Sequence, residues 1–127
     1  MGYAVFVEEL LVKRQLRTAL SEAEREHVQK SQISQLSDDD LLNEYERHTS
    51  THDSIYRAYS RLQRLWKQWQ LIISANPEEE EILQNYVSKY GDFQDILKEA
   101  VLVLQRLDRE RPLIEEELIK RQMEFEP

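Results

Sequence analysis

The chain has 127 residues, no cysteine and a formal net charge of -8 at pH 7. The absence of cysteine excludes a disulfide framework and a cysteine-based zinc site, and it favours the cytoplasm or another reducing intracellular compartment. Few glycines and prolines together with 33% charged residues are typical of long surface helices rather than sheets or disorder. We therefore expect an all-α fold, an elongated antiparallel helical bundle, in a single domain covering residues 1–127.

The first predicted helix covers about residues 3–30. Its apolar side chains recur on one helical stripe, as expected for a helix that packs in a bundle: Val5, Phe6, Leu10, Val12, Leu16, Ala19, Leu20 and Ala23. The apolar run at its start is too short for a secretory signal, and no window of the chain approaches the length of a membrane span. We expect no membrane partner.

A polar stretch over residues 29–36 predicts the first connection, and the second predicted helix covers about residues 38–75. Ser37 is a good N-cap, and Asp40 stands where a capping box has its acidic residue. From Leu41 onward, residues able to pack recur at alternating spacings of three and four: Leu41, Tyr45, His48, His52, Ile55, Tyr59, Leu62, Trp66, Trp69 and Ile73. At 1.5 Å per residue this helix is about 57 Å long, so the molecule should be elongated.

A turn at Asn76-Pro77 predicts a third helix over about residues 77–111. The heptad spacing continues there through Leu83, Tyr86, Tyr90, Phe93, Leu97, Ala100, Leu104 and Leu107. In an antiparallel hairpin, paired residue numbers add up to a constant, and a constant of 152 places Tyr59 opposite Phe93 and His48 opposite Leu104. We expect a coiled-coil-like hairpin over residues 38–111, although parallel self-association would show the same spacing.

Gly91 and Pro112 interrupt the third helical pattern. Because the spacing stays in phase across Gly91, we expect a continuous helix with at most a bend there; the alternative is that Gly91 caps one helix and Asp92 opens another. Pro112 lacks a backbone donor and its ring collides with the carbonyl of Asp108, so we expect the helix to kink or end near Arg111.

A C-terminal helical segment is predicted over about residues 113–124. With the hairpin closed at Arg111, this segment has no part of the second helix beside it. Its apolar face must either fold back over the first connection or dock on another chain. We take that face as the first candidate partner-binding surface: Leu113, Ile114, Leu118, Ile119, Met123 and Phe125.

Two histidines, His48 and His52, lie in the packed face of the second helix. We expect them to form a polar layer that selects the helix register, and to weaken the bundle when acid charges them. Their spacing can also hold a metal, and Glu24-x-x-His27 resembles one element of ferritin-like di-iron bundles, but the remaining ligands are missing. We therefore expect no metal, no cofactor and no catalytic residue, and no small-molecule substrate is evident.

Charge is unevenly distributed along the chain. Residues 54–76 contain Arg57, Arg61, Arg64 and Lys67 without an acid, which resembles nucleic-acid binders, but the overall negative charge argues against nucleic-acid binding. The last third of the chain holds most of the acidic excess, including residues 78–81 and 115–117. Spaced carboxylates of this kind can imitate a phosphate backbone.

These observations favour a non-catalytic interaction subunit or adaptor that binds a protein partner or self-associates. The alternative is an acidic antagonist that blocks a basic site on a nucleic-acid-processing enzyme. Charge reversals on the third helix would abolish binding by an acidic antagonist, whereas apolar changes would abolish binding by an adaptor.

Overall fold

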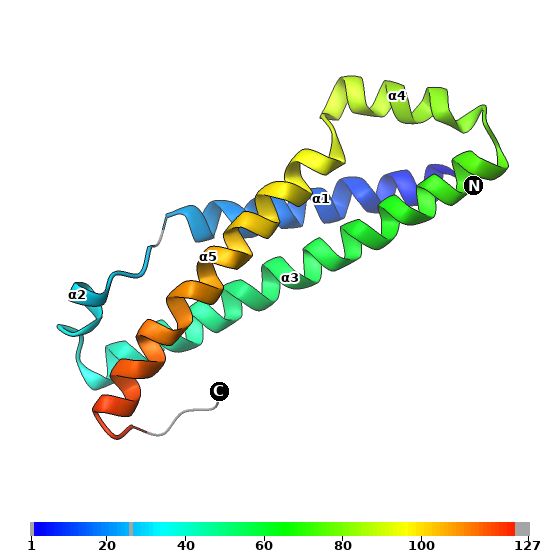
Figure 1. Cartoon of the computed structure of the whole chain (residues 1–127). Coiled ribbons are helices and arrows are strands. Elements are labelled where there is room, and N and C mark those ends of the chain that lie inside the picture. The colour runs from blue at the N-terminus through cyan, green and yellow to red at the C-terminus, as the bar shows by residue number, and fades with distance from the viewer. Residues whose placement is uncertain (1, 26, 124–127) are drawn as a thin grey trace.

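The computed structural model of the chain describes residues 2–25 and 27–123, with side chains from residue 6 onward. Regular structure in this part of the chain is entirely helical, which confirms the predicted all-α bundle. Figure 1 shows five helices: α1 (Gly2–Glu24), α2 (Lys30–Ile33), α3 (Asp38–Ala75), α4 (Glu79–Tyr90) and α5 (Phe93–Lys120).

The longest helix, α3, begins and ends where the sequence predicts. The side-chain oxygen of Ser37 accepts a hydrogen bond from the Asp40 backbone N–H at 3.2 Å, and three aspartates occupy the first turn, where the helix dipole favours negative charge. At the other end the backbone N–H of Asn76 still bonds to the Ile72 carbonyl before the chain turns.

The first helix is shorter than predicted, because α1 ends at Glu24 rather than near Lys30. Its apolar stripe stops at Ala23, so further turns would have little to pack. The Arg106 guanidinium, from α5, instead donates to the Ala23 carbonyl at 2.7 Å and satisfies one of the free carbonyls at the helix end. Lys30 belongs to the separate short helix α2.

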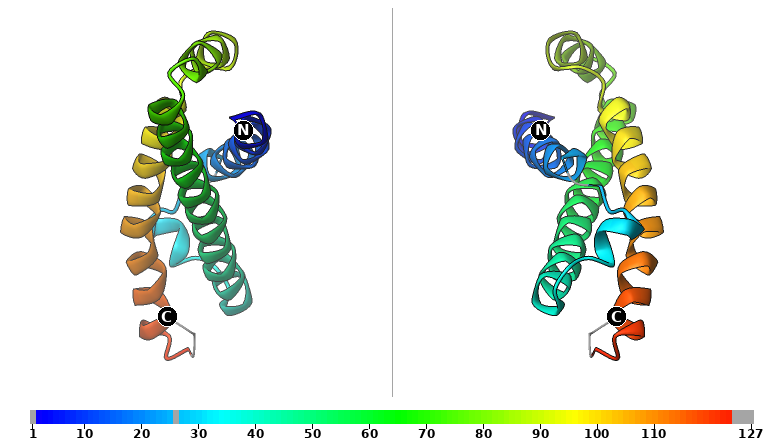
Figure 2. Two further views of the ribbon diagram at one scale, coloured as in Figure 1. Left: turned by 90° about the vertical axis from the view of Figure 1, so that its right-hand side faces the viewer. Right: turned by 90° about the vertical axis from the view of Figure 1, so that its left-hand side faces the viewer.

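The elements are arranged along α3, with α1 and α5 on different sides of it (Figure 2). The molecule is elongated: α4 lies at one end and α2 with the end of α5 at the other (Figure 1). The main apolar core is shared by α1, α3, α4 and α5. Its buried members are Val12, Leu16, Ala19, Leu20, Ala23, Ile55, Ala58, Leu62, Leu65, Trp69, Leu83, Tyr86, Phe93, Ile96, Ala100, Val103, Leu104 and Leu107.

The prediction of a continuous helix across Gly91 is wrong. Gly91 has φ 87° and ψ 167°, a conformation essentially limited to glycine, and it ends α4. The Asp92 side chain then accepts a hydrogen bond from the Gln94 backbone N–H at 2.9 Å and begins α5. This is the alternative in which the glycine and the aspartate cap two separate helices.

The break shifts the register of the hairpin by about one heptad. Phe93 lies beside Trp66, with ring centroids 5.3 Å apart, rather than beside Tyr59 as predicted. His48 likewise faces Glu110 instead of Leu104. Because a heptad pattern repeats every seven residues, a slip of seven keeps apolar positions facing each other, and only the geometry of the break selects between the two registers.

The sequence predicts a kink or a helix end near Arg111. The helix does not end there, since α5 continues through Pro112 to Lys120. Pro112 is exposed, so water can reach the carbonyl that its ring leaves without a donor. Leu107 before it and Ile114 after it are both buried. Tertiary packing on both sides therefore outweighs the local preference of the proline.

Candidate functional site: an apolar groove between α3 and α5

Two residues of the predicted C-terminal surface, Ile114 and Leu118, belong to the core of this chain. The register shift brings α5 alongside the first turns of α3, so the prediction that this segment has no helical neighbour is wrong. Ile114 and Leu118 are fully buried. They form a second apolar cluster, at the α2 end of the molecule, with Ile33, Leu41 and Tyr45. The segment thus folds back over the first connection.

Arg121 holds this fold-back in place. Its guanidinium contacts the Asp38 carboxylate at 3.1 Å and the Glu117 carboxylate at 2.9 Å, and it donates to the Ser34 carbonyl at 3.2 Å. One side chain therefore joins the end of α5, the start of α3 and the turn after α2. Such a clamp fixes the geometry of three segments at once.

The other members of the predicted surface are less enclosed. Ile119 is 64% exposed, whereas Leu113 and Met123 are half-buried against the second cluster. Phe125 lies outside the described residues. A partner-binding role for the exposed members stays a prediction, but Ile114 and Leu118 are not accessible to another chain.

The two histidines differ in their surroundings. His48 is buried, and its Nε2 lies 3.4 Å from a carboxylate oxygen of Glu110, which is also buried. The other oxygen of Glu110 accepts from the Val28 backbone N–H at 3.1 Å and lies 3.6 Å from the Arg106 guanidinium. A hydrogen-bonded polar layer therefore separates the main core from the second cluster.

His52 is half-buried and contacts Asp108 at 3.0 Å. Burial lowers the pKa of His48, although the neighbouring Glu110 carboxylate acts in the opposite direction. Within the described residues, no group of three or more histidine, aspartate and glutamate side chains could hold a metal ion. The His27 ring, which could have contributed to such a group, contacts Arg106 at 2.7 Å.

An apolar groove of about 470 Å³ runs between α3 and α5. Tyr59 and Leu97 are half-buried in it, and Leu102 at its edge is 65% exposed. The full lining is Tyr59, Gln63, Leu97, Lys98, Val101, Leu102 and Gln105.

This groove is on the side of the α3–α5 pair that faces away from α1. Arg61 of α3 pairs with Glu8 of α1 at 2.6 Å, and Glu99 of α5 pairs with Arg17 of α1 at 2.9 Å. Side chains two residues apart on a helix point in nearly opposite directions. The groove residues Tyr59 and Gln63 flank Arg61, and Leu97 and Val101 flank Glu99, so α1 covers one side of the pair and leaves the other open.

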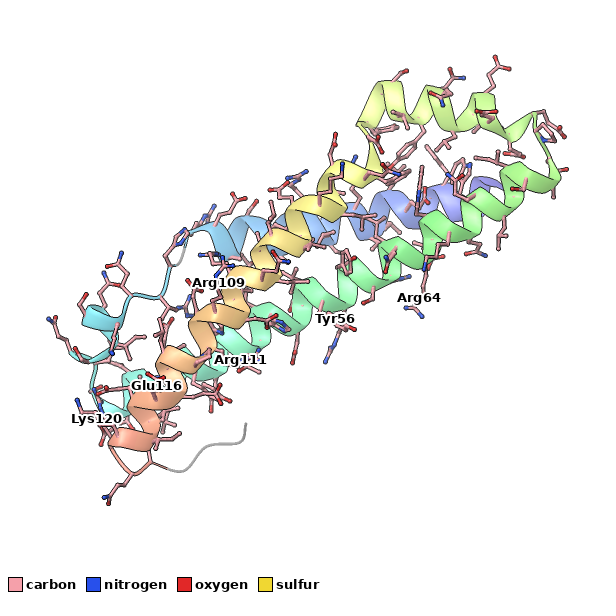
Figure 3. All side chains as sticks on the ribbon, viewed as in Figure 1. Tyr56, Arg64, Arg109, Arg111, Glu116 and Lys120 are labelled. Atoms are coloured by element: carbon pink, nitrogen blue, oxygen red, sulfur yellow. The ribbon has the colours of Figure 1, made fainter. Side chains whose placement is uncertain are left out.

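The edges of the groove carry positive charge. Lys98 lines it, Lys67 lies one turn beyond Gln63, and Arg109 lies one turn beyond Gln105. All three are exposed, and none forms an ion pair with any residue that the structure describes. Figure 3 labels Arg109 at the α5 edge; Arg64 of α3, also labelled, lies one turn after Arg61 and therefore nearer the α1 side than the groove. Three exposed cations therefore lie along the groove, together with an acid, Asp108, which lies one turn beyond Gln105 and contacts His52 at 3.0 Å.

Sequence reasoning recognised the components of this groove but not their arrangement. Tyr59 and Leu97 were expected inside the hairpin because they occupy heptad positions. The acid-free stretch with Arg57, Arg61, Arg64 and Lys67 was the available signal, since its cations needed partners. Only Arg61 finds one among the described residues, and it does so on α1 rather than on the third predicted helix.

No known family model, curated protein or solved structure matches this chain. In the described part of the chain, no helix combines the length and the apolar character needed to cross a membrane.

Proposed function

We propose that the protein is a non-catalytic adaptor whose α3–α5 groove binds an acidic amphipathic helix of a partner protein. The observation that carries the proposal is the combination of an open apolar groove between two antiparallel helices with unpaired cations at its edges. An amphipathic helix laid into such a groove buries its apolar face, and carboxylates along its flanks meet the edge cations.

The shape of the site supports a helix as the occupant. On the opposite side of the same helix pair, α1 packs lengthwise and contributes Leu16 and Leu20 to the core. A helix in the groove would take the equivalent place on the open side, which Tyr59, Leu97 and Val101 leave only partly covered. The side chains of Lys67, Lys98 and Arg109 would then lie along its flanks.

The first test uses a synthetic peptide as the probe. The peptide forms an amphipathic helix with leucine at positions i, i+3, i+4 and i+7 and glutamate on both flanks; a second version carries lysine in place of glutamate. Binding is measured by fluorescence anisotropy at low and high salt. We expect the glutamate peptide to bind, the lysine peptide to bind at least tenfold more weakly, and added salt to reduce the difference.

Two matched variants locate the binding. Leu102→Glu places a charge at the edge of the groove and should weaken binding about tenfold or more. Leu71→Glu makes the same change at a site of similar exposure near the end of α3 and outside the groove, and should leave binding within about twofold. Equal losses in the two variants, or equal binding of the two peptides, would contradict the proposal.

A photo-crosslinking amino acid at position 102 then identifies the natural occupant in cells. A crosslink to an acidic helical segment of another protein, lost in Lys98→Glu, supports the adaptor. A crosslink to a second copy of this chain replaces the adaptor with self-association. Capture of a nucleic-acid enzyme that depends on Glu80 and Glu81 but not on Leu102 supports the acidic antagonist instead.

A further inference from the structure

A second site, independent of the groove, lies where α1, α3 and α4 meet. Aromatic rings from three helices pack together there: Phe6 lies 4.8 Å from Tyr86 and 6.0 Å from Trp69, and Tyr86 lies 5.1 Å from Tyr90, measured between ring centroids. Tyr86 is also stacked on Phe93, with ring centroids 4.6 Å apart, and is only 3% exposed, so the accessible ring of this group is Tyr90, which is 41% exposed.

A pocket of about 500 Å³ opens beside these rings. Phe6, Tyr86 and Tyr90 form its aromatic wall, and Ile82 adds an exposed aliphatic side chain. This volume is enough for a small organic molecule. The polar members of the lining are Glu79, Asn85 and Lys89.

The ring faces at this end of the molecule already attract ammonium groups. The Lys13 Nζ atom lies 5.9 Å from the centroid of Tyr86 and 5.7 Å from that of Phe93, and the Lys89 Nζ atom lies 5.2 Å from that of Tyr90. These distances are within the range of a cation–π interaction. The chemistry of the wall therefore suits a positively charged ligand.

Unpaired polar atoms accompany the rings. One carboxylate oxygen of Glu79 is buried and has no hydrogen-bond partner among the described residues. Behind the wall, Glu9 is fully buried, and neither of its oxygens, nor Trp69 Nε1, nor the Tyr86 hydroxyl, has a partner in the same part of the chain. Among these groups, Glu79 lines the pocket, and its carboxylate can balance a cationic ligand by charge without a hydrogen bond.

The charge around the pocket favours a cation over an anion. Glu78, Glu79, Glu80 and Glu81 begin α4, whereas Lys89 is the one cation in the lining. We propose that the pocket binds an alkylated ammonium group carried on an apolar stem, with the cation held against the exposed Tyr90 ring and balanced by Glu79. An entering ammonium would take the place that Lys89 now occupies over the Tyr90 ring.

Two sources could supply this group: a free quaternary amine, or the trimethylated lysine side chain of another protein. Titration with choline tests the first, and titration with a trimethyllysine peptide tests the second. The uncharged isostere 3,3-dimethylbutan-1-ol and the unmethylated peptide are the respective controls. Backbone amide resonances of residues 79–90 report binding by NMR in the full chain. We expect at least one methylated probe to shift these resonances. Its dissociation constant should be at least tenfold lower than that of its control.

Three substitutions test the geometry. Tyr90→Leu keeps an apolar side chain but removes the ring face, and it should weaken binding about 3- to 30-fold. Glu79→Gln should also weaken it, because it removes the balancing charge. Lys89→Gln should strengthen it several-fold, since it removes the competing ammonium. These positions are partly or fully exposed, so the fold should tolerate the changes.

The proposal fails if neither probe shifts these resonances at about 20 mM. It also fails if the uncharged isostere and the unmethylated peptide bind as well as the methylated probes, because the pocket would then be only an apolar cavity. Weaker binding of a methylated probe to Lys89→Gln would show that Lys89 does not compete with the probe for the Tyr90 ring, and would likewise overturn the proposal. The two proposals fail independently: if the glutamate peptide did not bind the α3–α5 groove, binding of the methylated probes to this pocket would still be expected.

Discussion

The two ends of the molecule bury polar groups in different ways. Near α2, the buried Glu110 carboxylate accepts from the Val28 backbone, lies beside His48 and is close to Arg106. Near α4, the buried Glu9 carboxyl has no hydrogen-bond partner among the described residues. Both acids are buried, yet Glu110 has polar partners and Glu9 has none among the described residues; within the α2-end layer, His48 Nδ1 is the atom of His48 left without a partner there.

This difference indicates that the α2 end contributes more to stability and that the α4 end can change in response to a ligand. A buried carboxylate with hydrogen-bond partners favours one arrangement, whereas a buried carboxyl without partners costs free energy that a change of conformation can recover. The α4 end is also less enclosed, since Leu83 and Tyr86 are the buried residues of α4. We therefore expect the α2 end to resist unfolding and the α4 end to adapt.

The largest expected effect tests the packing of the α2 end. Leu118→Ala removes a fully buried side chain from the second cluster and should lower the free energy of unfolding by about 2–5 kcal/mol, measured by urea denaturation. The neighbouring Ile119→Ala, at a position 64% exposed, is the control and should change it by less than about 0.5 kcal/mol. Similar losses for the two variants would show that the segment is not packed as described.

The next effect tests the isolated acid at the α4 end. Burial raises the pKa of Glu9 from 4.5 to about 8. Because the folded state binds this proton more tightly than the unfolded state, stability is highest below pH 4.5 and falls as pH rises toward 8, by up to about 1.4 kcal/mol per pH unit.

Glu9→Gln removes that titration and should stabilise the protein by about 2–4 kcal/mol at pH 8 and little at pH 4.5. Urea denaturation across this pH range measures the difference. Glu22→Gln, at an exposed position on the same helix, should have no such effect. A difference between Glu9→Gln and the original chain that does not vary with pH would contradict this account.

A smaller effect tests the helix break at Gly91, which separates α4 from α5. Gly91→Ala places a side chain on a backbone with φ 87°, although the added Cβ would have room, with its nearest neighbour, Lys13 Nζ, 3.7 Å away. We expect a loss of about 1–3 kcal/mol from backbone strain alone. Ser88→Ala, exposed on α4, should be close to neutral. A stabilising Gly91→Ala would instead favour the continuous helix.

The smallest effect concerns the polar layer near α2. Burial lowers the pKa of His48, so the folded state resists its protonation and stability falls as pH drops below 6.5. Glu9 opposes this trend, and the effect is therefore measured in the Glu9→Gln background. In that background the melting temperature should fall between pH 7.5 and 5.5. The corresponding loss in the free energy of unfolding should be less than about 1.4 kcal/mol per pH unit. An unchanged value would argue against a neutral buried histidine.

Local signals in the sequence were sufficient for the elements whose boundaries depend on neighbouring residues. The N-cap at Ser37, the aspartates after it and the turn near Asn76 bound α3 correctly, because capping is decided within one helical turn. The groove was harder to predict. Tyr59 and Leu97 were correctly recognised as packing positions, but a heptad pattern looks the same after a slip of seven residues, so their partners could not be assigned.

The sequence by itself determined the helical class, the length and ends of α3, and a basic stretch lacking nearby acids. The tertiary structure decided that α4 separates at Gly91, that α5 passes through Pro112, and that Ile114 and Leu118 are core residues. The physical reason is one of scale. A glycine or a proline changes local stability by about 1–3 kcal/mol, and the burial of a few large side chains elsewhere in the chain outweighs that preference.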